Sequence, residues 1–162
     1  MAKFGNISRT KGFLAVVLAS TCLWGTSSYA AADGDAVKAA VAAYHAALGT
    51  KDPAKLEAFW VHDDSVTDIE PSPNKTIAVG WDAVKKSIEG YIPVVAELKI
   101  VQAEGPYVQV KSDLALSTGI ATAAVKLKDG KEFSQGVFET DVFEKHDGAW
   151  LLVSHSAAQV PQ

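Results

Sequence analysis

The order of hydrophobic and polar positions divides the chain into two regions. From Asp33 to Tyr91, apolar residues recur at helical spacing, and from Glu97 to Val160 they alternate or run continuously, as in strands. The pattern predicts three helices followed by four long antiparallel strands, with one brief strand before the third helix. The chain shows no internal repeat and no low-complexity linker. We therefore expect a single α+β domain.

The first predicted helix begins at Asp33 or Asp35, either of which can cap its free amides, and ends at Gly49. Its apolar face comprises Val37, Val41, Tyr44 and Leu48. A second, short helix begins at Asp52 and Pro53, because Asp is a good N-cap and Pro fits the first helical position. Its apolar side comprises Leu56, Phe59 and Trp60.

The segment "SVTDIEPSPN" alternates as a brief strand and ends in a turn at Pro71 to Asn74. The third helix, "WDAVKKSIEGY", follows Gly80 and stops at Gly90 to Pro93. Four strands then follow: "ELKIVQAEGPYVQV", "DLALSTGIATAAVKL", "EFSQGVFETDVFEK" and "AWLLVSHSAAQV". Turn signals join them at Lys111-Ser112, Asp129-Gly130 and Asp147-Gly148.

The last strand has apolar or small residues on both of its faces, over "WLLVSHSAA". A strand with this composition is covered on both sides. The helices cover one face of the sheet, and a second copy of the same sheet is the simplest cover for the other. We therefore expect a homodimer formed through the sheet.

The first thirty residues have the order of a secretory signal peptide. Cationic Lys3, Arg9 and Lys11 precede an apolar run over 13–23 that is about half the ~20 residues needed to cross a bilayer. Small residues then offer cleavage sites, and we favour cleavage after Ala30. The prediction is a 1–30 signal peptide, a 31–162 domain that is periplasmic or secreted, and no membrane association after cleavage. A lipid anchor on Cys22 is the alternative.

Composition removes several classes of function. Cys22 is the single cysteine, so the predicted mature chain can form neither a disulfide nor a thiolate metal site. Cleavage removes three of the 15 cationic residues and no acidic ones, leaving 12 lysines against 19 Asp and Glu, a net charge of −7. Nucleic-acid binding relies on clustered positive charge, and phosphate recognition favours arginine. We therefore expect no nucleic-acid partner.

Four motifs in a fixed order resemble one known superfamily. They are "VAAYHAALGTKDPAKLEAFWVHDDSV", "GWDAVKKSIEGY", "SDLAL" and "ETDVFEKHDGAWLLVSH", the last matching the pattern T-x-V-x-x-K-x-x-G-x-W. Together they span nearly the whole predicted mature chain. The sequence resembles the nuclear transport factor two superfamily, which includes SnoaL-like polyketide cyclases and ketosteroid isomerases.

The resemblance implies a cone-shaped α+β fold, in which three N-terminal helices pack on a curved, mainly antiparallel sheet. It also implies a pocket at the mouth of the cone, between the helices and the concave face of the sheet. Members of the superfamily include isomerases, cyclases, dehydratases and domains without a known reaction, so the fold alone does not select a function.

The resemblance also suggests catalytic residues. Tyr44 falls where the isomerases carry a tyrosine that donates a hydrogen bond to an oxyanion, although an inward-facing aromatic also suits a core position. The isomerases carry their base as an aspartate before proline, whereas here Glu70 precedes Pro71 after one additional residue. Asp68 shares a strand face with Glu70. Either could be the base, or both could face solvent.

His155 shares the parity of Leu151 and Val153, opposite Trp150. Relatives often place His and Ser after this tryptophan on its own parity, where this chain has serines. We favour a histidine at the dimer interface or in packing, and a pocket position only if a bulge inverts the parity. Glu139 and Asp141 also share one strand face. Inside a cone, two carboxylates held close together would raise the pKa of one of them and so mark a functional site. At a solvated edge the pair would have no such meaning.

We predict neither a metal nor a cofactor, because no two of the four histidines have ligand spacing on one element. Large aromatics can line a cavity for an apolar or aromatic molecule. The complete set of predicted ligand-binding residues is Tyr44, Trp60, Trp81, Tyr91, Glu139, Asp141 and His155.

Three functions compete. The first is an exported domain that binds a small, mainly apolar molecule in the cone. The second is an isomerase, cyclase or dehydratase that uses Tyr44 with Asp68 or Glu70. The third is a structural dimerisation module with a filled cone. An enzyme requires Tyr44 and a carboxylate to converge on one cavity, with burial raising the pKa of the carboxylate.

Overall fold

The computed structural model describes residues 25–71 and 77–161, with side chains from residue 31 onward. The lipid anchor on Cys22 and the turn that follows Pro71 lie outside these residues, and so does most of the predicted signal peptide. Within the described residues, no helix is both long enough and apolar enough to cross a bilayer.

Three helices are present, α1 (Gly25–Thr50), α2 (Pro53–Glu57) and α3 (Trp81–Glu89). The prediction for the start of α2 is confirmed, since the Asp52 side chain accepts a hydrogen bond from the Ala54 amide at 3.1 Å and Pro53 is the first helical residue. The predicted start of α1 is wrong. The helix continues back to Gly25, and three consecutive alanines at 30–32 favour helix across the predicted boundary.

The predicted end of α1 is also corrected. The helix runs to Thr50, and Lys51 has the left-handed conformation that ends it, with φ of 56°. Gly49 serves a different purpose, because a Cβ atom there would lie 2.9 Å from the Leu98 carbonyl oxygen. The glycine therefore permits close approach of α1 to the sheet.

The six strands form one sheet in the order β2-β1-β6-β5-β4-β3. Their bounds are β1 (Thr67–Ile69), β2 (Ala78–Val79), β3 (Val95–Lys111), β4 (Leu114–Leu127), β5 (Glu132–His146) and β6 (Ala149–Gln159). The four long strands match the prediction closely and are antiparallel to their neighbours. β1 pairs in parallel with β6, which the sequence did not indicate. This pairing brings the segment before Pro71 beside the end of the chain.

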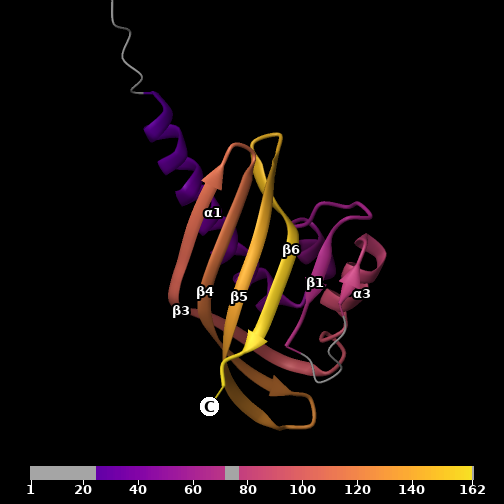
Figure 1. Ribbon diagram of the computed structural model, residues 1–162. Coiled ribbons are helices and arrows are strands. Elements are labelled where there is room, and N and C mark those ends of the chain that lie inside the picture. The colour runs from indigo at the N-terminus through magenta and orange to yellow at the C-terminus, as the bar shows by residue number, and fades with distance from the viewer. Residues whose placement is uncertain (1–24, 72–76, 162) are drawn as a thin grey trace, which may run out of the picture.

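The sheet is curved, and α1 crosses one of its faces (Figure 1). Three register shifts between β3 and β4 mark irregularities that bend these strands. Gly119 lies opposite this region, where a Cβ atom would come within 2.5 Å of the Gln102 side chain and 2.8 Å of the Glu104 carbonyl. Only glycine therefore fits at this bend.

The core lies between α1 and the concave face of the sheet. Its largest fully buried side chains include Leu56, Ile88, Phe143 and Leu152. The expectation that three helices pack on the sheet is only partly met. α1 covers β3, β4 and β6, whereas α3 contacts mainly the short strands β1 and β2 (Figure 1). The small size of α2 and the position of α3 leave one end of the concave face open.

Candidate active site

A cavity of about 690 Å³ occupies this open end of the concave face. Its walls come from the end of α1, the end of β1, α3 and the inner faces of β3 to β6. Most of the lining is apolar. Its ionisable residues are Glu70, Lys86, Tyr91, Glu139 and His155. The cavity therefore has the mixed lining of a small-molecule site, with apolar walls and few polar groups.

A bulge places His155 in this cavity. In the pairing of β5 with β6, Val142 lies opposite Ser154 but Phe143 lies opposite Leu152, so Val153 is an extra residue. The parity of the strand inverts there. Trp150 and Leu152 face the core before the bulge, and His155 faces the same side after it. His155 therefore faces the cavity and not the outer face at which a dimer would form, which is the orientation expected only if a bulge inverted the parity.

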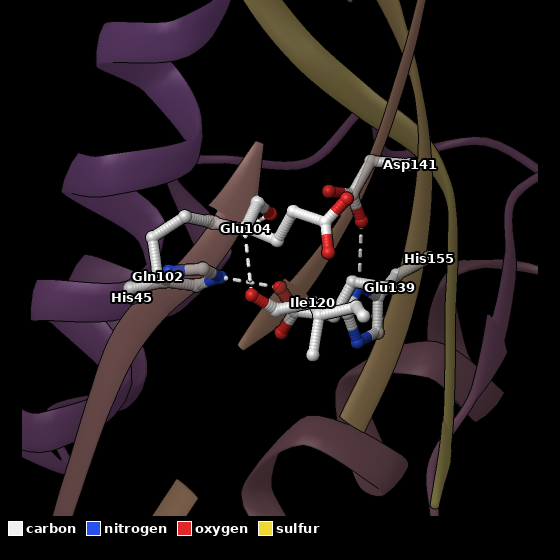
Figure 2. A network of polar contacts seen from close by, with 7 residues as sticks. All are labelled: His45, Gln102, Glu104, Ile120, Glu139, Asp141 and His155. Carbon is white, nitrogen blue, oxygen red and sulfur yellow. Dashed lines mark hydrogen bonds and ion pairs between the residues drawn. The ribbon is translucent and has the colours of Figure 1, made fainter. Parts of the chain in front are cut away.

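His155 and Asp141 form a buried pair. The Nδ1 atom of His155 lies 2.7 Å from Oδ1 of Asp141, and the side chains are about 5% exposed (Figure 2). Burial alone lowers the pKa of His155, but the hydrogen bond and charge of Asp141, with Glu70 and Asp68, outweigh it and raise the pKa to about 10. His155 is therefore an imidazolium at neutral pH that directs its Nε2–H away from Asp141.

Asp68 and Glu70 reach His155 from the opposite side. Asp68 pairs with His155 in the parallel β1–β6 register, so Asp141, His155 and Asp68 form a row across three strands. Asp68 is fully buried, and neither of its carboxylate oxygens has a hydrogen-bond partner. Burial raises the pKa of Asp68, against the charge of His155. Asp68 does not line the cavity.

Glu70 is partly exposed to the cavity. Burial raises the pKa of Glu70 to about 7, the charge of His155 opposes this, and the charges of Asp68 and Glu139 add to it. A carboxyl group with this pKa can both accept and release a proton near neutral pH. Of the two carboxylates proposed as the base, only Glu70 reaches the cavity.

Glu139 belongs to a second buried pair, with His45 of α1. The Nε2 atom of His45 lies 3.0 Å from Oε2 of Glu139, and both side chains are 7% exposed (Figure 2). Glu139 and Asp141 therefore both face inward, which resolves the question that the sequence left open. Glu139 lines the cavity, whereas Asp141 lies behind His155.

Tyr44 packs behind the site. Its ring makes an edge contact with the His155 ring, with the ring centroids 5.8 Å apart. Its buried hydroxyl has no hydrogen-bond partner among the described residues. Burial raises the pKa of Tyr44 well above its ordinary value, so the phenol stays protonated. Tyr44 is not among the residues that line the cavity. The structure therefore does not bring its hydroxyl together with a carboxylate in the cavity.

The predicted aromatic lining is only partly present. Tyr91 lines the cavity and donates a hydrogen bond to the Leu48 carbonyl at 2.5 Å. Trp60 is buried in the core, and Trp81 stacks on His62 with ring centroids 3.9 Å apart. Neither tryptophan lines the cavity. Aliphatic side chains form most of the wall instead.

Asp68, Glu70 and His155 also have the spacing of metal ligands, since one ligand atom from each lies within 4.8 Å of the other two. Histidine binds a metal ion only as neutral imidazole. The raised pKa of His155 and its bond to Asp141 favour a proton on the ring. A metal ion at this group would therefore have to displace the proton from His155.

Sequence reasoning missed the role of His45. Its position was visible, because Val41, His45 and Leu48 recur at helical spacing and so share one face of α1. The partner of His45 could not be identified, since Glu139 is 94 residues away in the chain. The contributions of Lys86 and Gln135 to the cavity were missed too, and neither belongs to a recognisable motif.

Comparison with known proteins gives one family match. Residues 37–161 match the model of a SnoaL-like domain. No curated protein matches the chain. The matched segment contains every residue of the site described above.

Several solved structures share the fold. A protein from Streptomyces avermitilis, proposed to be a dehydratase of the nuclear transport factor 2-like family, is 21% identical over 82% of this chain and 99% of its own, with a TM-score of 0.73. A protein from Xanthomonas campestris, proposed to be a calmodulin-dependent protein kinase II association domain, is 24% identical over 78% and 86%, with a TM-score of 0.65.

A type 2 hexachlorocyclohexane dehydrochlorinase is also similar. It is 13% identical over 81% of this chain and 87% of its own, with a TM-score of 0.66. At these identities the similarity shows a shared fold. The three proteins have different described roles, so the site must carry the functional argument.

Proposed function

Since this chain belongs to the SnoaL-like domain family, we propose that it is an exported enzyme that transfers protons on a small, mainly apolar molecule bound in its cone. One observation carries the proposal. Glu70 and His155 both line one cavity, with a carboxylate oxygen and a ring nitrogen within 4.8 Å of each other. Near neutral pH Glu70, with a pKa of about 7, can accept a proton, while His155, with a pKa of about 10, keeps its own. The dehydratase and dehydrochlorinase among the similar structures are consistent with such chemistry.

The roles follow from charge. Ionised Glu70 is the base that removes a proton from a carbon beside a carbonyl group. The C–H electron pair moves toward the carbonyl, and the imidazolium Nε2–H of His155 donates a hydrogen bond to the oxygen as negative charge develops there. Asp141 holds His155 in the protonated form and fixes the ring. Return of the proton to another carbon completes an isomerisation.

Two other roles fit the molecule less well. A structural module needs no cavity, whereas this cone contains one of about 690 Å³. A pure binding protein needs apolar walls but gains nothing from a base and an imidazolium that meet in the same space. Burying ionisable groups is costly, so four carboxylates and two histidines in one region indicate chemistry.

Solvent deuterium exchange tests the function. We expect the purified protein to accelerate exchange at the carbon beside the carbonyl of a bicyclic ketone such as 2-decalone, by at least tenfold over buffer and with saturation kinetics. Mass spectrometry of the recovered ketone measures the incorporation. A chelator is expected to leave the rate unchanged, because the mechanism uses protons alone. Binding of the ketone without accelerated exchange would contradict the proposal.

Export is part of the proposal and concerns residues outside the site. The first buried side chain in the described part of α1 is Val37. Cleavage near Ala30 would shorten α1 without removing any described core residue. Asp33 would remain, so its ion pair with Lys145 would be preserved. The mass of the chain recovered from the periplasm or medium identifies the cleavage position.

The outer face of the sheet supports the proposed homodimer. It carries an apolar patch that we call the outer-face patch, comprising Val101, Tyr107, Leu114, Leu116, Ile120, Phe138 and Val142. The pairing of β3, β4 and β5 places the side chains of these residues on the face of the sheet opposite α1. Five of them are more than a third exposed. A contiguous apolar face of this kind is typical of a protein interface.

Phe138→Asp is expected to convert the dimer to a monomer, because it places a charge within the outer-face patch. Light scattering during gel filtration measures the mass. Val94→Asp is the matched control, since Val94 is 55% exposed but lies in the turn after α3. The dimer prediction is wrong if the wild-type protein is a monomer at micromolar concentration.

A further inference from the structure

The polar groups of the cavity form two rows across the strands. The first row is Asp141, His155 and Asp68. In the second row, Glu139 pairs with Ala157, and Glu70 follows the Ile69–Ser156 pair and so comes level with Ala157. Glu139 and Glu70 therefore flank a small residue. With strands about 4.8 Å apart, their Cα atoms are about 10 Å apart across the sheet.

The second row lies nearer the mouth of the cavity than the first. Glu139 and Glu70 of the second row line the cavity, whereas Asp141 and Asp68 of the first row do not. On the inner face of β5, Asp141, Glu139 and Val137 are at most 6% exposed, whereas Phe133 at the far end is 45% exposed. The carboxylates and His155 thus occupy the closed end of the cavity, and the walls nearer the opening are mostly apolar, with Gln135 and Lys86 among their polar residues. A ligand with an apolar body is therefore expected to place its polar end at the closed end.

Glu139 has one oxygen available for that molecule. The Nε2 atom of His45 lies 3.0 Å from Oε2, and Oε1 has no hydrogen bond from the described part of the chain. The pair with His45 holds the side chain in place, because α1 supplies the histidine and the sheet supplies the carboxylate (Figure 2). A fixed, buried carboxylate oxygen that lines a cavity accepts a hydrogen bond and repels an anion.

We infer that Glu139, held by His45, is a specificity-determining residue that selects a neutral ligand with a hydrogen-bond donor, a hydroxyl or N–H group, on an apolar body. The donor binds Oε1 of Glu139 above Ala157, opposite Glu70. This inference rests on the proposed function for the placement of the reacting carbon beside Glu70. It extends that function by defining the class of substrate.

Three bicyclic probes test the inference by equilibrium binding, without any catalytic readout. They are 2-naphthol, which has a donor; 2-methoxynaphthalene, which has none; and 2-naphthoate, an anion. A hydrogen bond to a buried carboxylate is expected to favour the naphthol over the ether by about tenfold or more. The anion is expected to bind more weakly than the naphthol, because Glu139 and Glu70 flank the proposed position of the donor, although His155 and the exposed Lys86 of the same cavity oppose this effect. Isothermal titration of the full chain measures all three affinities.

Glu139→Gln is expected to reduce the preference for naphthol over the ether to less than threefold, because the amide is uncharged and its NH₂ can serve the ether oxygen. Glu132→Gln is the matched control, as it makes the same change on β5 at an exposed position and should preserve the preference. Equal affinities for naphthol and ether in the wild-type protein, or no binding of any probe, would overturn the inference.

The wild-type comparison requires no variant, so the inference stays testable even if Glu139→Gln does not fold. The two proposals also fail separately. Selective naphthol binding without ketone exchange would contradict the proposed catalysis alone. Ketone exchange without donor selectivity would contradict the role of Glu139 alone.

Discussion

Glu70→Gln is expected to lower kcat/KM for ketone exchange by about 10²- to 10⁴-fold, the usual contribution of a positioned general base. Glutamine keeps the shape of the side chain but cannot accept the proton. Ligand affinity is expected to change much less, because the amide still fits the same wall of the cavity. The measurement is the exchange rate at saturating and subsaturating ketone, together with the binding constant.

A matched control separates the loss of the base from a general loss of charge. Glu89→Gln makes the same change on α3, close to the cavity but outside its lining. It should leave kcat/KM within about twofold of the wild-type value. Burial raises the pKa of Glu70, so the fold disfavours its carboxylate form. Its removal should therefore not reduce stability by more than about 1 kcal/mol.

The same assay has an expected pH profile. The proposed mechanism requires ionised Glu70 and protonated His155. The pKa of Glu70 is raised to about 7, so the rate should rise as pH increases through 7. The pKa of His155 is raised to about 10, so the rate should fall as pH approaches 10. A profile that declines from pH 6 to 8 would exclude Glu70 as the base in the free enzyme.

Asp141→Ala is expected to reduce the free energy of unfolding by about 3 kcal/mol at pH 7. Breaking a buried ion pair costs about 3–5 kcal/mol, because the remaining charge stays buried without its partner. We expect the lower end of this range, since Asp68 and Glu70 also face His155. Urea denaturation monitored by tryptophan fluorescence measures the difference.

Glu144→Ala is the matched control for this variant. It removes a carboxylate from the same strand, β5, that contacts His146 at 3.5 Å with both side chains more than 40% exposed. Exposed pairs contribute about 0–1 kcal/mol, so little stability should be lost. A cost for Asp141→Ala as small as that for Glu144→Ala would mean that the buried pair does not hold His155 as an imidazolium.

The pH dependence of this difference has a definite sign. The pKa of His155 rises from an ordinary value of 6.5 to about 10 in the folded protein. The stabilisation from the protonated ring is therefore fully present below pH 6.5 and is lost as pH rises through 10. The stability gap between wild type and Asp141→Ala should narrow over that interval.

The sequence determined the order and bounds of the long strands, because their alternation and turn residues are local signals. Asp147-Gly148 illustrates this, since both residues have positive φ in the turn between β5 and β6, as the two-residue hairpin requires. The start of α2 at Asp52 and Pro53 was readable for the same reason. Capping depends on residues that adjoin in the chain.

The orientation of the candidate site residues was decided by the tertiary structure. His155 faces the cavity because one extra residue, Val153, inverts the strand, and strand parity alone predicted the opposite face. Asp68 meets His155 because β1 joins β6 in parallel, and His45 meets Glu139 because α1 crosses the sheet. These contacts join segments about 85 to 95 residues apart. The hydrophobic pattern of one segment does not indicate which distant segment will pack against it.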